Sequence, residues 1–387
     1  GEKELKTSDN TVVGYYYLLP AGDYYLTTDL DLGDAYITTA TGTVDLCLNG
    51  HSIQTTAKYA IYVSNATSTL VTLNLCDCKG TSGTYGEITR TSGSSGTGVE
   101  IRTENKFNMY GGRITGNNKS GVDTSGGYFT MYGGDITKNK ADYGGGVSTS
   151  SDTANFTMYG GSITENHANK SGGGIYSNSN NISIYGGSVT DNSVTKNGKA
   201  GGIYVSSSDT LTVGGNVNIS GNWQGDSKES GSKSNVYLNG NTSGSSATIV
   251  IENKLTGAPI GVTTANAPTA GNPVTIVTGN SIEETYKDSF QADNAAYGVS
   301  YNSTDKVLQL HKHSGGTATC MAPAVCTTCG QPYGNTNPNN HDLEHHEAKA
   351  ATCTEVGWNA YNTCKREGCS YTTYKEIAAL NHALVHH

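Results

Sequence analysis

The apolar positions of this chain recur in a fixed phrase between residues 107 and 223. Four copies of the phrase end in tyrosine and two glycines, and a fifth keeps only the glycines; the copies begin at Met109, Met131, Met158, Ile184 and Val213. The steps between successive copies are 22, 27, 26 and 29 residues. Steps of this size, with short β-branched runs and glycine corners, are typical of a solenoid in which each repeat is one turn of chain.

Within each repeat, apolar and polar residues alternate, which is the period of a strand and not of a helix. Phe129 and Met131, for example, alternate with Thr130 and Tyr132. A second strand follows each glycine pair, and a third element follows the glycine runs that begin at Gly144, Gly172 and Gly201. Three short strands per turn predict an all-β fold, a right-handed parallel β-helix.

An asparagine follows each second strand at the same distance. These asparagines are Asn117, Asn139, Asn166, Asn192 and Asn222. Stacked on successive turns, their side-chain amides can bond each other and the turn backbone, so we expect an asparagine ladder.

Strand candidates continue on both sides of the repeats. Residues 11–105 are interpreted as irregular opening turns, and residues 247–310 as closing turns. We therefore predict an N-terminal cap over residues 1–22, because an open solenoid end needs cover, and a β-helix over residues 23–310. Disorder is the alternative for a chain with 51 glycines, but the phased Ile, Val, Phe and Met positions argue against it.

The charge pattern excludes one class of partner. The formal net charge is −9, and the repeats carry no cluster of lysine or arginine, so we expect no nucleic-acid partner. No apolar run has membrane-spanning length, and the first residues contain no signal-peptide core. A mature secreted protein and a cytosolic one both fit these features.

Several phrases resemble a known family. They are residues 46–53 (LCLNGHSI), residues 75–78 (LCDC), the repeated FTMYGGxITxN and residues 144–147 (GGGV). Together they are similar to the β-helix surface proteins that gut Firmicutes and related anaerobes secrete in large families, over roughly residues 15–310. The resemblance implies a secreted or cell-surface protein of a Gram-positive bacterium with a pectate-lyase-like β-helix. It implies no catalytic residue.

After residue 310 the composition changes, and six of the nine cysteines fall in residues 311–387. We predict two small modules, residues 311–343 and 344–387, which share a frame of His, Cys, Cys, Cys and His. The first frame is His313, Cys320, Cys326, Cys329 and His341; the second is His346, Cys353, Cys364, Cys369 and His382. The second module also resembles the Cys-rich modules that follow repeats in the same surface proteins.

Three cysteines per module favour zinc over disulfides, because disulfides use thiols in pairs, whereas three thiolates and one imidazole complete a tetrahedral zinc site. We predict one site from Cys320, Cys326, Cys329 and His341, and another from Cys353, Cys364, Cys369 and His382. His313 and His346 are the alternative closing ligands, and His345, His346, His386 and His387 can instead be solvated. One disulfide plus a spare thiol per module is the competing interpretation.

The other three cysteines, Cys47, Cys76 and Cys78, lie on early strands whose leucines take the opposite phase. We expect all three to point away from the leucines. If their strands stack as neighbouring turns, ~4.8 Å apart, two of them could form a disulfide.

A search for an active site yields one weak column. The variable position after each second strand holds Gly116, Lys138, Glu165, Asp191 and Gly221, so the three charged residues should line up outward. A solvated face is one interpretation, and a calcium site between carboxylates is another. Arg113, Asp135 and His167 are scattered, and no pattern singles them out.

Four tyrosines, Tyr110, Tyr132, Tyr159 and Tyr185, should stack in a second outward column. The column suits sugar rings or another protein, or it stabilises neighbouring turns. We expect a non-enzymatic, adhesin-like or structural surface protein whose partners are cell-surface glycans or further copies of itself in a head-to-tail filament. The alternative is a carbohydrate-active enzyme, either a polysaccharide lyase or a glycoside hydrolase.

Overall fold

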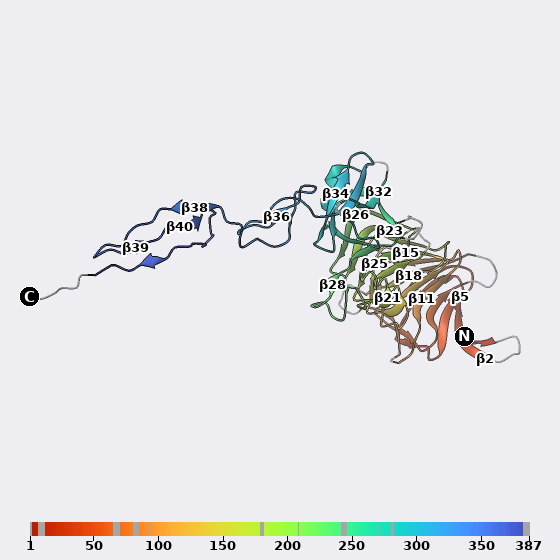
Figure 1. Cartoon of the computed structure of the whole chain (residues 1–387). Helices are drawn as coiled ribbons and strands as arrows, with labels where there is room; N and C mark the ends of the chain where they lie inside the picture. The colour runs from red at the N-terminus through yellow and green to blue at the C-terminus, as the bar shows by residue number, and fades with distance from the viewer. Residues whose placement is uncertain are drawn as a thin grey trace, which may run out of the picture. The chain divides into compact units, whose positions relative to one another are not determined.

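The structure is a computed structural model (Figure 1). It describes residues 2–6, 12–64, 70–79, 85–91, 93–178, 182–207, 209–240, 246–269, 271–279 and 282–381. The chain forms two compact units, residues 1–311 and residues 312–387.

The first unit is a right-handed parallel β-helix, as the repeats predict. Its described strands form three long sheets, and each turn of chain, here called a coil, contributes to at least two of them. The first sheet has twelve described strands. They are β1 (Glu2–Lys6), which pairs antiparallel with the next strand, and then β2 (Val12–Leu19), β5 (Ala35–Thr39), β8 (Tyr59–Val63), β11 (Thr97–Arg102), β14 (Val122–Ser125), β18 (Val147–Thr149), β22 (Ile175–Ser177), β25 (Ile203–Val205), β29 (Val236–Leu238), β31 (Ile260–Thr264) and β33 (Phe290–Ala292) from successive coils.

The second sheet takes two strands from most coils, one on each side of the glycine corner. Its eighteen described strands are β3 (Gly22–Tyr25), β4 (Leu30–Asp31), β6 (Gly42–Cys47), β7 (Ile53–Thr55), β9 (Val71–Cys76), β10 (Glu87–Arg90), β12 (Lys106–Met109), β13 (Arg113–Thr115), β15 (Tyr128–Met131), β16 (Asp135–Thr137), β19 (Asn155–Met158), β20 (Ser162–Thr164), β23 (Ile182–Thr190), β26 (Thr210–Ser220), β30 (Thr248–Leu255), β32 (Val274–Thr278), β34 (Tyr297–Asn302) and β35 (Val307–Lys312).

A third, shorter sheet covers the middle coils. In the part of the chain that the structure describes it has five strands: β17 (Lys140–Tyr143), β21 (His167–Ser171), β24 (Ser193–Val194), β27 (Trp223–Gln224) and β28 (Ser232–Lys233). The glycine runs of the sequence lie between this sheet and the first one, before β18, β22 and β25.

Strands that carry the same sequence phrase pair with each other, and this pairing sets the register between coils. Phe107, Phe129 and Phe156 are direct partners on neighbouring strands. Their buried rings stack with centroids 5.0 and 4.9 Å apart. The core of the β-helix is therefore a set of like-on-like columns, which a one-residue slip of any strand would turn outward.

The second glycine of each pair makes the corner between the two strands of the second sheet. Gly134, for example, has a φ of +85°, a conformation that favours glycine. A Cβ atom there would lie 2.7 Å from both the Gly112 carbonyl oxygen and the Met109 Cε atom. The corner thus requires glycine both for its backbone conformation and for the close approach of the next coil.

The predicted asparagine ladder is present, and all five asparagines are buried. The Nδ2 group of each donates to the Oδ1 atom of the next, at distances from 2.8 to 3.0 Å over the five predicted members. The ladder continues one step further than the repeats indicate, because Asn222 donates to Asn235 at 3.1 Å. Asn235 in turn donates to the half-buried carboxylate of Asp293 at 2.7 Å.

Antiparallel strands occur at both ends of the β-helix. At the N-terminal end β1 pairs antiparallel with β2, and β2 pairs parallel with β5, so a strand within the predicted cap already belongs to the first sheet. Of the predicted closing strands, β30 and β31 continue the parallel order. The last one, β35, turns back and pairs antiparallel with β32, after the short 3-10 helix η1 (Glu284–Ser289).

The second unit contains only short antiparallel pairs among its described residues: β36 (Ala324–Val325) with β37 (Pro332–Tyr333), β38 (Leu343–His346) with β40 (Tyr361–Cys364), and β39 (Gly357–Trp358) with β41 (Glu376–Ile377). No helix in the described part of either unit is long and apolar enough to cross a membrane.

Candidate metal centres and outward-facing rows

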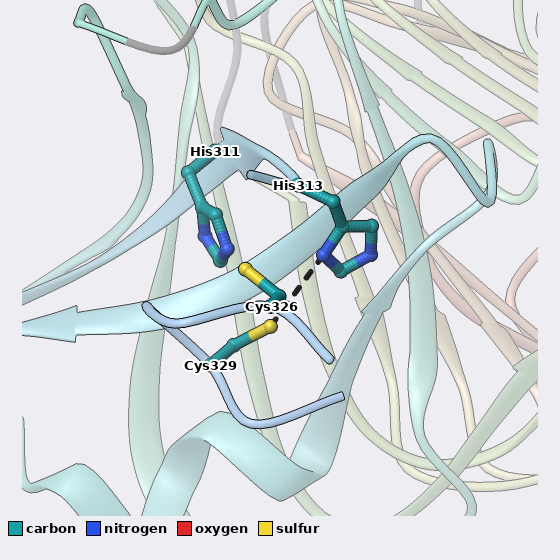
Figure 2. Close-up of side chains that lie close together, drawn as sticks. All are labelled: His311, His313, Cys326 and Cys329. Carbon is teal, nitrogen blue, oxygen red and sulfur yellow. Dashed lines mark hydrogen bonds between the residues drawn. The ribbon is translucent and has the colours of Figure 1, made fainter. Parts of the chain in front are cut away.

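A first Cys/His group lies around strand β35 and the β36–β37 hairpin. The ligand atoms of His311, His313, Cys326 and Cys329 are all within 4.8 Å of one another, and Figure 2 shows the four side chains turned toward a common centre. The two histidines alternate with Lys312, so they share one face of the extended chain. The cysteines belong to a tight knuckle in which the Gly330 amide donates to the Cys326 carbonyl oxygen at 2.9 Å.

The first group already favours a thiolate. Although burial acts in the opposite direction, hydrogen bonds from the His313 side chain and from nearby backbone amides lower the pKa of Cys326 to about 5. Burial raises the pKa of Cys329, and the neighbouring Cys326 adds to this shift. Two sulfur and two imidazole donors at this spacing match the tetrahedral donor sets of structural metal sites.

A second Cys/His group consists of Cys320, His341, Cys364 and Cys369, whose ligand atoms also lie within 4.8 Å of one another. The Cys320 and Cys364 sulfurs are 3.7 Å apart, and the Cys369 sulfur is 3.4 Å from His341 Nδ1. Despite some desolvation, backbone and side-chain hydrogen bonds lower the pKa of Cys364 to about 6. Three sulfurs and one imidazole again suit a closed tetrahedral site.

Strand pairing explains how this second group is assembled. Leu343 on β38 pairs with Cys364 on β40, which brings the segment just before β38, including His341, beside Cys364. The Cys320 amide donates to the Asn340 carbonyl oxygen at 3.1 Å, so Cys320 lies next to His341. The ligands of this group therefore come from both predicted modules.

The structure divides the predicted ligands differently from the sequence analysis. It keeps the pairs Cys326 with Cys329 and Cys364 with Cys369, but it places Cys320 and His341 with the second pair. His313 closes the first group, which is the alternative that the sequence left open. Cys353 belongs to neither group among the described residues, and His382 lies outside the described residues.

Two features account for the difference. The sequence analysis took the equal gaps in the two modules as a sign that each module closes on itself, whereas the β38–β40 hairpin joins them. The first group also uses His311, which the sequence analysis did not consider as a ligand. The sequence feature that could have identified His311 is the His-x-His spacing at residues 311 and 313, because a strand directs both rings to one side. His345 and His346 instead bond Asn362 and Thr363, and His386 and His387 lie outside the described residues.

The three early cysteines also converge, with their sulfurs within 4.8 Å of one another. Cys47 and Cys76 are direct partners on β6 and β9. Cys47 forms a disulfide with Cys78, whereas Cys76 is not in a disulfide. Burial raises the pKa of the Cys76 thiol, and the nearby carboxylates of Asp45 and Asp77 add to the shift, so this thiol is a weak nucleophile at neutral pH.

The charged column of the sequence analysis lies on a corner of the β-helix. Lys138, Glu165 and Asp191 all adopt positive φ angles, of 57°, 56° and 56°, so the variable position is the left-handed residue of the turn. Lys138 pairs with Glu165 at 3.6 Å, and Asp191 pairs with Lys228. These exposed ion pairs are typical of a solvated face.

Arg113 and His167 also contact side chains on neighbouring coils. Arg113 lies between Glu87, at 3.0 Å, and Asp135, at 3.8 Å, on the adjacent coils. His167 contacts the Ser193 hydroxyl at 2.9 Å, and burial lowers the pKa of this histidine. Arg113 and Asp135 line one groove together with Glu87, Lys138 and Glu165, and the opposite charges in it are paired with each other. His167 does not line this groove.

The tyrosine column faces outward as predicted. The rings of Tyr110, Tyr132, Tyr159 and Tyr185 stack with centroids 4.8, 5.4 and 5.4 Å apart and interplanar angles of 4°, 11° and 28°. Each inner ring is covered on both faces by its neighbours, so water meets mainly ring edges and hydroxyls. Because a sugar ring binds to an aromatic face, this arrangement favours the interpretation that the column stabilises neighbouring coils.

Replacing Tyr159 by Ala tests this interpretation. The variant loses two ring contacts and should lower the free energy of unfolding by about 1 to 3 kcal/mol, measured by urea denaturation. Tyr159→Phe is the matched control, because it keeps the ring and removes only the hydroxyl. Equal losses in the two variants would show that the hydroxyl, and not stacking, is what matters.

Two neighbouring carboxyl groups lie on the outward face of the first sheet. Glu100 on β11 pairs directly with Asp123 on β14, and the Glu100 residue is only 7% exposed. Burial, together with the charge of Glu100, raises the pKa of Asp123 to about 6 from a usual 3.8. Hydrogen bonds from Ser125 and Ser150 and the charge of Arg102 act in the opposite direction.

The raised pKa predicts a pH dependence of stability. The folded state holds the Asp123 proton more tightly than the unfolded state, so the stabilising contribution of this group is fully present below pH ~4 and is lost as the pH rises through about 6. Asp123→Asn should therefore gain about 1 to 3 kcal/mol at pH 7.5 and lose this dependence, as measured by denaturation at several pH values. The contrasting control is Asp142→Asn, because bonds to Asn169 and Lys170 lower the pKa of Asp142; a gain in this variant would contradict the account.

Comparisons with known proteins add no relative. No protein-family model matches the chain, no curated protein is similar to it, and no solved structure matches it.

Proposed function

We propose that this protein is a non-enzymatic, extracellular surface protein of the kind that gut Firmicutes and related anaerobes secrete, with the β-helix as a long display scaffold. The observation that carries the proposal is that outward-facing side chains stack on, or bond to, the side chains at the same position on neighbouring coils. Tyrosine stacks on tyrosine in the Tyr110–Tyr185 column, Asn74 bonds Asp45 and Asn108, and Arg113 pairs with both of its neighbours. In these rows the outward side chains thus bind each other between coils.

The disulfide between Cys47 and Cys78 supports the extracellular part of this proposal, because disulfides persist mainly in oxidising compartments. The proposed metal of both Cys/His groups is zinc, since closed sites with two or three sulfur donors and imidazole are typical of structural zinc. In this role the metal holds the second unit together and takes part in no reaction.

Two measurements test the proposed role. Intact cells of the producing bacterium should bind an antibody against the β-helix and lose that signal after mild protease treatment; signal only in the soluble cell fraction would overturn the proposal. In addition, the purified protein should release neither reducing ends nor unsaturated products from a panel of polysaccharides. Release of either would favour the alternative, a glycoside hydrolase or a polysaccharide lyase.

The proposal includes head-to-tail assembly. Sedimentation velocity should show species larger than the 40.4 kDa chain that increase with protein concentration. A single species of monomer mass at all concentrations would remove assembly from the proposal and leave the display role intact.

A further inference from the structure

One outward row of the first sheet carries aromatic side chains at both ends and polar side chains in the middle. Direct strand partners in this row are Tyr62, Glu100, Asp123, Ser148, Tyr176, Tyr204 and Tyr237. Aromatic rings occupy both ends, and Tyr176, Tyr204 and Tyr237 stack with centroids 5.1 and 5.8 Å apart. Three smaller polar side chains replace the rings on the coils between. Since coils are ~4.8 Å apart, Tyr62 and Tyr176 are separated by about 19 Å.

A groove of about 400 Å³ opens beside this interruption, and both Asp123 and Ser148 line it. This volume lies within the range of small-molecule sites. Tyr143 on β17 also lines the groove and is 41% exposed. Its ring lies 4.9 Å from Tyr176 but is tilted by 46°, so the two rings do not cover each other as the parallel rings of the tyrosine column do.

The ammonium group of Lys170 lies 5.1 Å from the Tyr143 ring centroid. An exposed cation–π contact is worth only about 0.5 to 1 kcal/mol, and Lys170 is also paired with Asp142 at 3.0 Å. A ligand ring on this face of Tyr143 would therefore compete only with a weak contact.

The remaining lining of the groove is polar and balanced in charge. Two carboxylates, of Asp123 and Asp142, are offset by the ammonium groups of Lys119 and Lys140. The side-chain amides of Asn118 and Asn169 also border the groove. Their Nδ2 groups donate to the Ser94 carbonyl oxygen and to Asp142 Oδ1, and each amide has a second N–H group and an oxygen besides. This lining has no excess of either charge to attract a polyanion or a polycation, but it offers many partners for hydroxyl groups.

We propose that this groove binds a neutral glycan, with one sugar ring on Tyr143 and its hydroxyls bonded to Asp123 and Asn169. A sugar ring presents apolar C–H groups on its faces and hydroxyls around its edge, which matches an aromatic wall next to mixed donors and acceptors. The row runs along the helix axis, so further sugar residues of a chain can extend toward Tyr62 or Tyr176. The inference rests on the proposed extracellular role only for where the glycan comes from.

Isothermal titration with the full-length protein tests the groove. The probes are neutral oligosaccharides of glucose, xylose, mannose, galactose and N-acetylglucosamine, with oligogalacturonate as the charged comparison. We expect at least one neutral series to bind, and Tyr143→Ala and Asn169→Ala each to weaken that binding tenfold or more. Tyr132→Ala, which removes a similarly exposed ring from the second sheet, should leave the affinity unchanged, and thermal melts confirm that each variant is folded.

Several results would overturn the inference. These are no binding of any neutral oligosaccharide at millimolar concentration, preferred binding of oligogalacturonate, or an equal loss in Tyr132→Ala. If a bound glycan is instead cleaved, and Asp123→Asn stops the cleavage, the groove is confirmed as the site and the non-enzymatic role is wrong. An intracellular location with intact glycan binding would contradict the proposed function alone.

Discussion

Removing metal from the purified protein should unfold residues 312–387 and leave the β-helix folded. Among the described residues of this unit, Ala324 and Cys326 are the buried apolar side chains, so there is no apolar core that could hold it. Structural zinc contributes roughly 10 to 16 kcal/mol in small domains, which is more than the total stability of most domains of this size. Elemental analysis should give two zinc ions per chain, and a chelator should make the unit protease-sensitive.

Single cysteine variants distinguish the two ways of dividing the ligands. Cys320→Ser should abolish the group that contains Cys364 and Cys369 and leave the zinc at Cys326 and Cys329 in place. Cys353→Ser is the matched control and should keep both ions, because Cys353 belongs to neither group. Loss of one ion in Cys353→Ser, or loss in Cys320→Ser of the ion held by Cys326 and Cys329, would contradict the structure. Absence of zinc together with disulfide-linked peptides from residues 312–387 would exclude a metal altogether.

Replacing Asn166 by Leu should lower the free energy of unfolding of the β-helix by about 3 to 5 kcal/mol. The Asn166 amide donates to the Ile136 carbonyl oxygen at 2.9 Å and to Asn192 Oδ1 at 3.0 Å. Its own Oδ1 atom accepts from the backbone and side-chain nitrogens of Asn139, at 3.1 and 3.0 Å. The leucine variant leaves these donors and acceptors buried without partners, and each such group costs about 1 to 3 kcal/mol.

The measurement is the urea midpoint and the melting temperature of the variant against the wild type. Asn253→Leu is the control, because Asn253 is exposed on β30 and the same change there should shift stability by about 0.5 kcal/mol or less. If both variants have the same urea midpoint and melting temperature as the wild type, the ladder contributes no stability.

The sequence determined the β-helix itself. Alternation around Phe129 and Met131 fixed which side chains face inward, and the repeated phrase fixed the register, because like residues stack only when whole repeats are aligned. The asparagines after each second strand were also readable, since their position is set by local turn geometry. Even the outward column of Lys138, Glu165 and Asp191 was placed correctly in space, although the sequence could not show that these side chains are ion-paired on a left-handed corner.

Only the tertiary structure showed the contacts between segments that do not carry the repeated phrase. Asn235 and Asp293 extend the ladder, but neither belongs to a repeated phrase that would reveal it. Glu100 and Asp123 became neighbours only through the pairing of β11 with β14. Cys320 and His341 lie with Cys364 and Cys369 because the β38–β40 hairpin crosses the predicted module boundary. A solenoid repeats its contacts and so displays them in its sequence, whereas a metal site gathers ligands from segments whose spacing along the chain does not reveal their distance in space.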